Sequence, residues 1–296
     1  MALESIISND QNTYDVIIVG GGPAALSCSI YLKKSGLKVA FIEKNIPGGK
    51  LLSLTKINNL IGYENISGAD LAISYFNHTN KLGVEFIYDE VLRIAKKNQY
   101  YIFYTSSKTN YFSKYVVIAT GVKNASLGIP GEKDYVNKGV SYCVTCDKSL
   151  IRNKTVILVG DYEEAVELSL LAKKVYFLST YSNNLNPKIK VINSTIVAII
   201  GNNDHVTSVI LDNGEEIVID HVFINQGGKP ELSFAYELNL EIKDGIITTD
   251  PNSKVSSISE IYAIGDVSKS ENRQVSTAIS DGALAAMDIV AKIVKK

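Results

Sequence analysis

The chain has 296 residues, 46% hydrophobic and 21% charged, a balance typical of a globular protein with one large domain or two of ordinary size. Lys and Arg (30) nearly balance Asp and Glu (31), so net charge gives no sign of a nucleic-acid or membrane-surface partner. The polar start is unlike a secretory signal, and no apolar run approaches the roughly 18 residues of a membrane span. Because three cysteines fit a reducing compartment, we expect a cytoplasmic protein.

A strand–turn–helix–strand pattern begins at residue 14. Residues 14–19 form an apolar run rich in β-branched residues, which predicts a buried parallel strand. A glycine-rich turn (20–25, GGGPAA) leads into an amphipathic helix over 26–35, which Gly36 closes as a C-cap. A second strand over 38–42 completes a βαβ unit.

The turn of this unit matches the G-x-G-x-x-[GA] fingerprint of dinucleotide binding. Gly20 permits the tight turn, Gly22 lets the backbone approach a pyrophosphate, and the small Ala25 lets helix and strand pack closely. Glu43 ends the second strand, where an acid can bond the ribose hydroxyls of an adenosine. The unit therefore predicts a dinucleotide site, and Cys28 inside its helix is interpreted as a small buried hydrophobe.

The following segment alternates between short apolar runs and polar turns, which predicts an inserted antiparallel layer before the chain returns to a buried strand. The expected elements are a turn at 47–51, a helix over 69–82, alternating strands between 84 and 115, a buried strand over 116–119 ending in Thr120-Gly121, and a crossover loop over 122–139.

A pair of closely spaced cysteines lies near the middle, in Cys143-Val144-Thr145-Cys146-Asp147. A zinc site would need four ligands, and the sequence offers neither a second such pair nor a histidine pair. The CxxC spacing suits a reversible disulfide and tends to lower one thiol pKa, and Asp147 could transfer the proton. The alternative is two buried cysteines in a packed turn.

The strand–turn–helix plan then starts again. Residues 155–159 resemble the first strand, Gly160 corresponds to Gly20, and a helix over 163–174 leads to a strand over 175–178. Further short strands are expected at about 189–199, 205–211 and 215–224. The sequence thus predicts two copies of one nucleotide-domain plan.

The second turn, residues 160–165 (GDYEEA), differs from the first where a nucleotide would bind. A tyrosine stands where backbone would approach phosphate, and three acids crowd the helix start. Acids there satisfy the free N–H groups internally and repel a pyrophosphate, by about 1–4 kcal/mol per like-charge contact near 4 Å. The next strand ends without an arginine for a 2′-phosphate or an acid for ribose. We therefore interpret this copy as a nucleotide-type domain that has lost its nucleotide.

From Gly245 the chain is expected to re-enter the first domain. A buried strand over 261–264 ends in Gly265-Asp266, and a small-residue helix over 276–290 follows. An Asp at a strand end beside a helix N-terminus suits hydrogen bonding to a polyol chain, although a solvated loop Asp is the alternative.

Together these motifs resemble the low-molecular-weight, bacterial-type thioredoxin reductases over essentially the whole chain. The matching segments are VGGGPAA (19–25), PGGKL (47–51), VVIATG (116–121), GIPGE (128–132), YCVTCD (142–147), IYAIGD (261–266) and RQVSTAISDGALAA (273–286). The resemblance implies an α/β fold of two Rossmann-like, three-layer domains, the second inserted in the first. Residues 1–121 and 245–296 would form the FAD-binding domain, and 122–244 the CxxC-bearing, degenerate NADPH-type domain.

The resemblance also implies site residues. Cys143 and Cys146 would be the redox pair that exchanges electrons with the flavin, and Asp147 the proton donor. The implied FAD contacts are Gly20, Gly22, Pro23, Ala24, Ala25, Glu43, Lys44, Gly49, Lys50, Leu51, Asn59, Val91, Thr120, Gly121, Asp266, Arg273, Gln274 and Val275. Two of them depart from the family pattern, because Lys50 replaces a glutamine and Ala25 a glycine.

The larger departure is in the NADPH region. The family's GGGDSA-like turn is replaced by GDYEEA, and its HRRxxxR motif by LSTYSNN (178–184). This pattern resembles the flavin thioredoxin reductases that take electrons from ferredoxin. Three hypotheses follow: a ferredoxin- or flavodoxin-dependent reductase of thioredoxin or a thioredoxin-like protein, an NAD(P)H-dependent one with an atypical nucleotide site, or a redox-sensing flavoprotein. The resemblance further implies a homodimer without bound metal.

Overall fold

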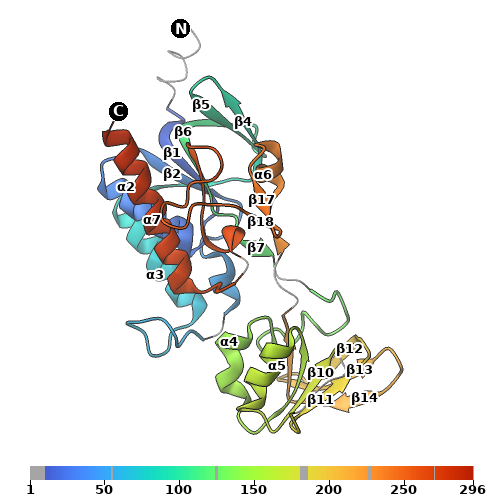
Figure 1. Cartoon of the computed structure of the whole chain (residues 1–296). Coiled ribbons are helices and arrows are strands. Elements are labelled where there is room, and N and C mark those ends of the chain that lie inside the picture. The colour runs from blue at the N-terminus through green and yellow to red at the C-terminus, as the bar shows by residue number, and fades with distance from the viewer. Residues whose placement is uncertain are drawn as a thin grey trace. The chain divides into compact units, whose positions relative to one another are not determined.

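The computed structural model describes residues 11–54, 56–123, 126–180, 186–225, 229–269 and 271–295, with the side chains of Thr145 and Cys146 excepted. The chain divides into two compact units. Figure 1 shows the whole chain, coloured by residue number from blue at the N-terminus to red at the C-terminus. Unit 1 comprises Met1–Leu54, Ile66–Val122 and Pro230–Lys296, and unit 2 comprises Thr55–Asn65 and Lys123–Lys229.

Unit 1 is built on a seven-stranded sheet in the order β3-β2-β1-β6-β5-β4, with β19 also paired to β6. Its parallel strands are β1 (Thr13–Val19), β2 (Val39–Glu43), β3 (Glu85–Tyr88), β6 (Asn110–Ile118) and β19 (Ile261–Ala263). The strand β5 (Tyr100–Thr105) continues the sheet antiparallel to β6, and β4 (Val91–Lys97) pairs antiparallel to β5. The apolar runs of β1 and β2 are buried, as a parallel sheet covered on both faces requires.

One strand, β6, serves both parts of this sheet. Its first half, residues 110–113, pairs with β5, and its second half, residues 116–118, pairs with β19. The sequence-based separation of an antiparallel layer ending at 115 from a buried strand starting at 116 is therefore wrong. The assignment of β3 to the antiparallel layer is also wrong, because β3 pairs parallel to β2.

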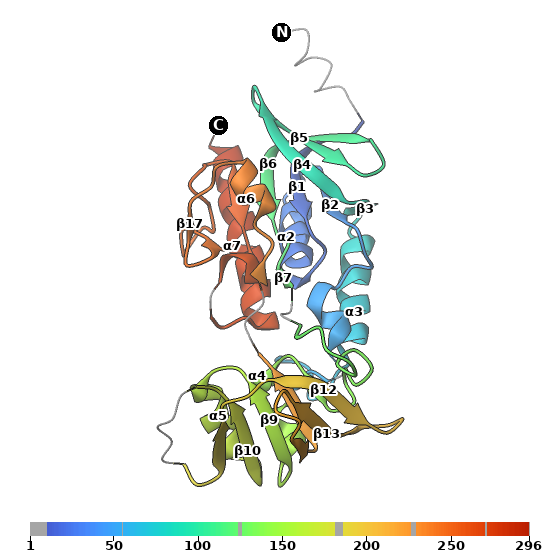
Figure 2. The same cartoon turned by 90° about the vertical axis from the view of Figure 1, so that its right-hand side faces the viewer.

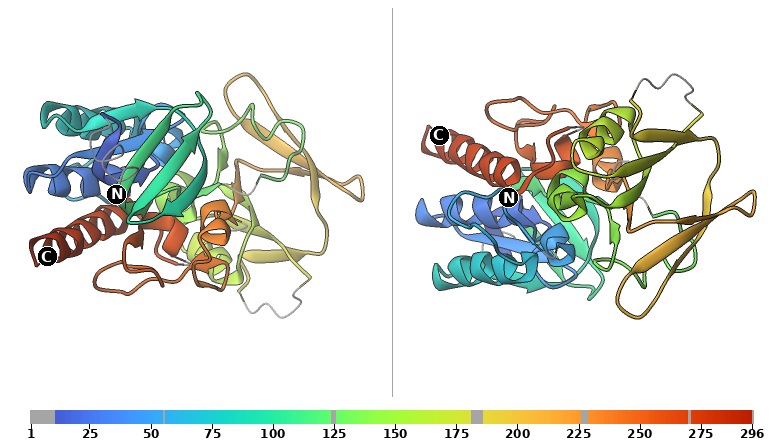
Figure 3. Two further views of the ribbon diagram at one scale, coloured as in Figure 1. Left: turned by 90° about the horizontal axis from the view of Figure 1, so that it is seen from above. Right: turned by 90° about the horizontal axis from the view of Figure 1, so that it is seen from below.

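Three long helices lie side by side over one face of the unit 1 sheet, as Figure 3 shows. They are α2 (Pro23–Lys34), α3 (Gly68–Lys81) and α7 (Val275–Val294). The backbones of α2 and α7 approach closely, because a Cβ on Gly282 would lie 2.3 Å from the Ala24 carbonyl oxygen. Ala278, Ala285 and Ala286 complete a small-residue face that permits this packing.

On the opposite face of the parallel strands, residues of β4, β5 and α6 (Ser233–Glu237) share one hydrophobic core with β1, β2 and β6, and these elements are labelled in Figure 2. Phe234 and Ala235 of α6 pack in the same core as Tyr101 and Phe103. Unit 1 therefore resumes at Pro230 and not at Gly245, because α6 contributes to its core. The remaining short elements of unit 1 are η1 (Gly49–Ser53), β17 (Ile242–Lys243), β18 (Ile246–Ile247) and η3 (Gly265–Ser268). Where the chain passes between units, β7 (Val122–Lys123) pairs with β16 (Lys229–Pro230).

Unit 2 contains a five-stranded parallel sheet and a three-stranded antiparallel one. The parallel order is β11-β10-β9-β15-β8, from β8 (Val140–Ser141), β9 (Thr155–Val159), β10 (Lys174–Leu178), β11 (Ile189–Ile192) and β15 (His221–Ile224). The antiparallel sheet contains β12 (Ile196–Gly201), β13 (Val206–Leu211) and β14 (Glu216–Val218). The helices are α4 (Val144–Asp147), η2 (Lys148–Ile151) and α5 (Tyr162–Ser169).

The predicted α/β class is confirmed, and the helix bounds differ in three places. Helix α2 begins at Pro23, since proline is well suited to a first helical position. Helix α5 ends at Ser169 and not at 174, because the N–H of Lys173 bonds the Lys154 carbonyl at the entrance to β10. Helix α7 continues to Val294. Among the helices of the described segments, none is long and apolar enough to cross a bilayer.

We predict that acid destabilises unit 2 through His221. This residue of β15 is 5% exposed, and in the described structure its Nδ1 has no hydrogen-bond partner. Burial and the nearby Lys154 charge lower the pKa of His221 from 6.5 to about 4. The unfolded chain therefore binds the proton better, so this stability is complete above pH 6.5 and is lost as pH falls towards 4, by on the order of 1–3 kcal/mol.

The measurement is the free energy of unfolding by urea at about pH 7.5 and about pH 4.5. His221→Leu should reduce the difference between the two values, whereas His78→Leu, at an exposed position on α3, should not. An unchanged difference in His221→Leu would show that other groups cause the acid sensitivity.

Candidate dinucleotide and dithiol sites

The turn between β1 and α2 leaves a helix N-terminus open. Gly20 has φ +113°, and a Cβ there would lie 2.4 Å from the Ala119 carbonyl oxygen, so only glycine fits against the end of β6. Gly22 is the N-cap of α2, and a Cβ built on it would meet no described atom within 4 Å. No described side chain caps α2, and its first turn carries no acid. The first N–H groups of α2 are therefore available to an anion.

Glu43, at the end of β2, holds the same turn from the side. One carboxylate oxygen accepts the Gly21 N–H at 2.9 Å and the other accepts the Asn45 N–H at 2.9 Å. Each oxygen keeps a further lone pair, so the predicted bonding of ribose hydroxyls is compatible with both contacts. The neighbouring Lys44 pairs with Glu90 at 2.7 Å, directly before Val91 at the start of β4.

Two further segments meet this turn. A Cβ on Gly49, in η1, would lie 3.3 Å from the Gly22 Cα, and the Gly48 N–H donates to the Gly21 carbonyl at 2.8 Å. Lys50 in turn lies 4.0 Å from Asp266, which belongs to η3 after β19. Burial lowers the pKa of Lys50 and raises that of Asp266, while their mutual attraction opposes both shifts.

The structure thus brings most of the sequence-predicted dinucleotide contacts to the carboxyl ends of β1, β6 and β19. Gln274 is the N-cap of α7 and Val275 its first residue, and the side chain of Arg273 donates to the Lys269 carbonyl at 2.9 Å. Thr120 and Gly121 follow β6, where both bond Glu231. Pro23, Ala24 and Ala25 open α2, and Leu51 is buried in η1. Asn59 falls in unit 2, whereas the other predicted contacts belong to unit 1.

The corresponding turn of unit 2 is filled by its own side chains. A Cβ on Gly160 would lie 2.5 Å from the Glu164 carboxylate, which accepts the Asp161 N–H at 3.2 Å and also bonds the Asn225 amide. Burial raises the pKa of Glu164, although these two hydrogen bonds oppose the shift. Helix α5 has 8 residues against 12 in α2, and Glu163 and Glu164 lie in its first turn. The arginine-free segment predicted at 178–184 is described only as far as residue 180.

The second site of interest is the start of α4. Cys143 is disulfide-bonded, and the side chain of Cys146 lies outside the described part of the chain. The Ser141 hydroxyl donates to Asp147 at 2.6 Å and accepts the Cys143 N–H at 3.1 Å. Burial raises the pKa of Asp147, and the Ser141 hydrogen bond partly offsets it. A partly buried carboxyl of raised pKa beside a disulfide cysteine is suited to transfer a proton.

Sequence reasoning missed a second carboxylate next to the dithiol segment. Glu132 is 1% exposed and accepts hydrogen bonds from Tyr142, Gly128 and Leu127 at 2.7, 2.8 and 3.1 Å. Burial alone would raise the pKa of Glu132, but these bonds lower it. Tyr142 directly precedes Cys143, so Glu132 anchors the entry to α4. The GIPGE segment was the available signal, but it does not reveal the tyrosine partner.

Cys28 takes no part in either site. It is a free thiol, fully buried in α2, and burial strongly raises its pKa. A neutral thiol without solvent access is a poor nucleophile.

An open dinucleotide turn in one unit and a disulfide beside a buried carboxyl in the other define a dinucleotide-dependent disulfide oxidoreductase. The family model for pyridine nucleotide-disulphide oxidoreductases matches residues 14–282. The chain is 34% identical to a thioredoxin reductase of Mycoplasma genitalium over 307 residues, 96% of both chains. A solved thioredoxin reductase from Streptococcus pyogenes has 34% identity and a TM-score of 0.90, over 97% of this chain and 100% of that one.

A solved ferredoxin-flavin thioredoxin reductase from Clostridium acetobutylicum is also similar, with 29% identity and a TM-score of 0.56, over 96% of this chain and 99% of that one. The chain therefore belongs to the thioredoxin reductase family of pyridine nucleotide-disulphide oxidoreductases. It is a flavin-dependent oxidoreductase that binds FAD. The uncapped N-terminus of α2 and the open space over Gly22 fit the pyrophosphate of such a cofactor.

We predict that Gly22→Ala weakens FAD binding about tenfold or more, which corresponds to about 1.4 kcal/mol. The protein itself has room for the methyl group, so a bound pyrophosphate is what it would meet. The apoprotein should lose only about 1 kcal/mol of stability, from a poorer N-cap. The measurements are FAD titration by fluorescence and thermal unfolding of the apoprotein.

Gly36→Ala is the matched control. Gly36 ends the same helix with φ +83° in open space, so the substitution also costs about 1 kcal/mol but is remote from the turn. Equal FAD affinities of the two variants would argue against a cofactor at Gly22.

We predict that Ser141→Ala moves the pH dependence of thioredoxin reduction. Because the Ser141 hydroxyl lowers the pKa of Asp147, its removal should raise that pKa and move the limb of the pH–rate profile that reports Asp147 to higher pH. Ser149→Ala, in the exposed part of η2, should leave the profile in place. A shift towards lower pH in Ser141→Ala would contradict the assignment.

Proposed function

We propose that this protein reduces the disulfide of thioredoxin or a thioredoxin-like protein, with Cys143 and Cys146 as the redox pair and Asp147 as the proton donor. The observation that carries the proposal is the disulfide-bonded Cys143, whose backbone N–H donates to the Ser141 hydroxyl, which in turn donates to the Asp147 carboxylate. The thioredoxin reductase relatives support the substrate. The FAD contacts are proposed to be those implied by the sequence, with the turn at Gly20–Ala25 holding the pyrophosphate.

The reaction at the dithiol balances in electrons and protons. When reduced by its electron donor, bound FAD would supply two electrons, which together with two protons open the Cys143–Cys146 disulfide to two thiols and leave the flavin oxidised. One of these, as thiolate, attacks the thioredoxin disulfide and forms a mixed disulfide, and the second then displaces thioredoxin as its dithiol. Asp147 gives a proton to the departing thioredoxin sulfur and takes one from the attacking thiol, so that two protons pass to thioredoxin with the two electrons. The pair is oxidised again, and two electrons have passed to thioredoxin.

We propose, as the first candidate, that the electrons come from ferredoxin, flavodoxin or another carrier that is not a pyridine nucleotide. Glu164 occupies the turn where phosphates would bind, and no described residue there supplies the bidentate guanidinium that a 2′-phosphate prefers. The ferredoxin-flavin enzyme of Clostridium acetobutylicum supports this candidate.

The second candidate is NAD(P)H, bound at an atypical site. The comparisons favour it, because the matching family model is described by its pyridine nucleotide and the ferredoxin-flavin relative is the less similar. This candidate requires Glu164 to leave its hydrogen bonds to Asp161 and Asn225 when a nucleotide binds.

The low number of cysteines supports a cytoplasmic location, and the family resemblance supports a homodimer.

The proposed redox pair predicts that Cys143→Ser and Cys146→Ser each abolish thioredoxin reduction while keeping bound FAD. Both thiols belong to one exchange cycle, and neither is among the proposed cofactor contacts. Cys28→Ser is the control and should retain activity, because Cys28 is buried and free. Asp147→Asn should slow turnover by about 10²-fold. An essential Cys28 with a dispensable Cys146 would show that the redox pair is misassigned.

Anaerobic stopped-flow reduction of the bound flavin distinguishes the two donors. On the first candidate, reduced ferredoxin bleaches the flavin quickly and NADPH or NADH does not, in wild type and in Glu164→Ala alike. Rapid, saturable reduction by NADPH would establish the second candidate. In that case Glu164→Ala should reduce faster than wild type at low NADPH, because it removes a negative charge from the phosphate position.

A further inference from the structure

Asp281, in the second turn of α7, is a buried carboxylate that no step of the proposed reaction uses. Its side chain is 3% exposed, and the sequence motif that contains it gives no role for it. A buried carboxylate is strongly disfavoured unless it is paired, so its partners indicate what it does.

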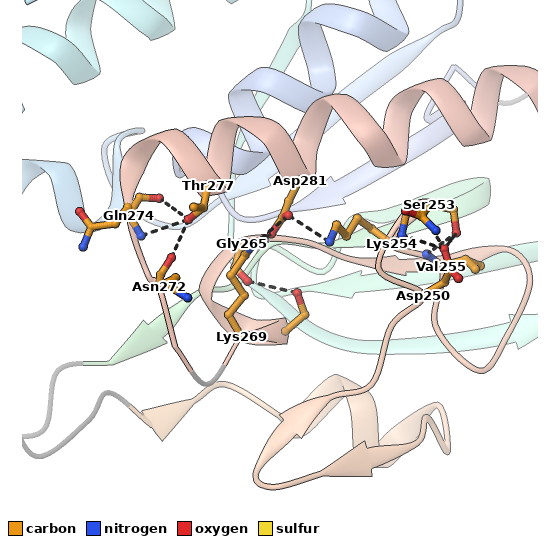
Figure 4. Close-up of polar contacts among 12 residues, drawn as sticks. Asp250, Ser253, Lys254, Val255, Gly265, Lys269, Asn272, Gln274, Thr277 and Asp281 are labelled. Carbon is orange, nitrogen blue, oxygen red and sulfur yellow. Dashed lines mark hydrogen bonds and ion pairs between the residues drawn. The ribbon is translucent and has the colours of Figure 1, made fainter. Parts of the chain in front are cut away.

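Three groups converge on this carboxylate, as Figure 4 shows. The Gly265 N–H donates to it at 3.2 Å, and the ammonium groups of Lys269 and Lys254 lie at 3.0 and 3.3 Å. Gly265 and Lys269 bracket η3, the segment that contains Asp266. One side chain of α7 thus holds both ends of η3.

The backbone around Lys254 is shaped to deliver its ammonium. Lys254 has φ +61°, a conformation that costs roughly 1–2 kcal/mol for a residue with a Cβ. A compact turn maintains it, in which the Asp250 side chain accepts the Ser253 N–H at 2.8 Å and the Asp250 carbonyl accepts the Lys254 N–H at 2.9 Å. The Lys254 side chain is 13% exposed. Lys254 thus combines a strained backbone with a largely buried side chain. The ion pair with Asp281 accounts for both, because it compensates their energetic costs.

The groups tied together by Asp281 border the dinucleotide turn. Gly265 has φ +71°, and a Cβ on it would lie 3.1 Å from the Ala24 Cβ in the first turn of α2. Asp266 follows directly, and Gln274 and Val275 begin the helix that carries Asp281. The position of Asp266 relative to the N-termini of α2 and α7 therefore depends on the Asp281 contacts.

We propose that Asp281 is a positioning residue for the FAD site, which fixes Asp266 against the start of α7 through Gly265, Lys254 and Lys269. The inference rests on the proposed role of Asp266 and Gln274 as FAD contacts. Removal of the Asp281 charge would leave two partly buried ammonium groups close together without a counter-charge, so η3 would move away from α7. Asp266 would then no longer lie where the cofactor needs it.

The test uses Asp281→Asn in the full chain, with FAD affinity and the visible circular dichroism of the bound flavin as readouts. We expect binding at least tenfold weaker and an altered dichroism, because the flavin environment changes and not only the stability of the fold. Asp288→Asn is the matched control. Asp288 lies on the same helix and pairs with Lys292 at 2.9 Å and Tyr262 at 2.6 Å, but has no contact with η3 among its described bonds. It should lose stability and keep both flavin readouts.

Lys269→Met keeps the test decisive if Asp281→Asn does not fold. It leaves Asp281 paired with Lys254, so the fold should persist while one end of η3 is released. We expect FAD binding to weaken severalfold with the same change of dichroism, and Asp281→Asn/Lys269→Met to bind FAD no more weakly than Asp281→Asn alone.

Asp266→Asn separates this inference from the proposed site. Strong loss of FAD in Asp266→Asn, with normal affinity and dichroism in Lys269→Met and in any folded Asp281→Asn protein, would overturn the positioning role alone. Normal FAD binding in Asp266→Asn would overturn the proposed cofactor contact and the inference with it.

Discussion

The structure of unit 1 depends on the contact of backbone with backbone at the end of β1. A Cβ on Gly20 would lie 2.4 Å from the Ala119 carbonyl oxygen, which excludes it, and a Cβ on Gly49 would lie 3.3 Å from the Gly22 Cα, which leaves little room. These approaches bring β1, β6 and η1 around the N-terminus of α2, and no side chain of the described segments caps it. An anion site made of backbone N–H groups requires open space at the helix N-terminus. The close backbone contacts that create this space also make the turn intolerant of substitution.

In unit 2 the same strand–turn–helix plan recurs, but a side chain of the unit itself lies in the turn. Glu164 satisfies the Asp161 N–H that a phosphate would otherwise bind, and its other oxygen is bonded to Asn225. The turn thus contains a carboxylate of its own, which supplies both a hydrogen-bond acceptor and a group that can carry negative charge. What unit 2 retains is the parallel sheet, which presents Ser141, at the end of β8, to Cys143 and Asp147. One strand–turn–helix plan therefore has an open turn in unit 1 and a filled turn in unit 2, where the sheet instead leads to the disulfide-bonded Cys143.

Much of this could be predicted from the sequence, because the decisive signals are local. The glycine spacing predicted the first turn, and the acids of 160–165 predicted that the second turn would differ from it. The apolar runs predicted the bounds of β1, β2, β9 and β10 to within a residue or two. The misassignments have long-range causes: the division of β6 between two partners, the early return at Pro230, and the short α5 all depend on pairing with distant segments. The Glu132–Tyr142 bond and the Asp281 cluster were unforeseen because each partner looks ordinary in its own segment.

We propose that the two turns of one plan differ in occupancy, with a dinucleotide at the first and the Glu164 carboxylate at the second. The most direct test is a crystal structure of the protein grown with FAD and an excess of NADPH. We expect one dinucleotide per chain, with its pyrophosphate against residues 20–25 and with Glu164 still hydrogen-bonded to Asp161 and Asn225 at the second turn. A second dinucleotide, with phosphates against residues 160–165 and Glu164 displaced, would contradict it.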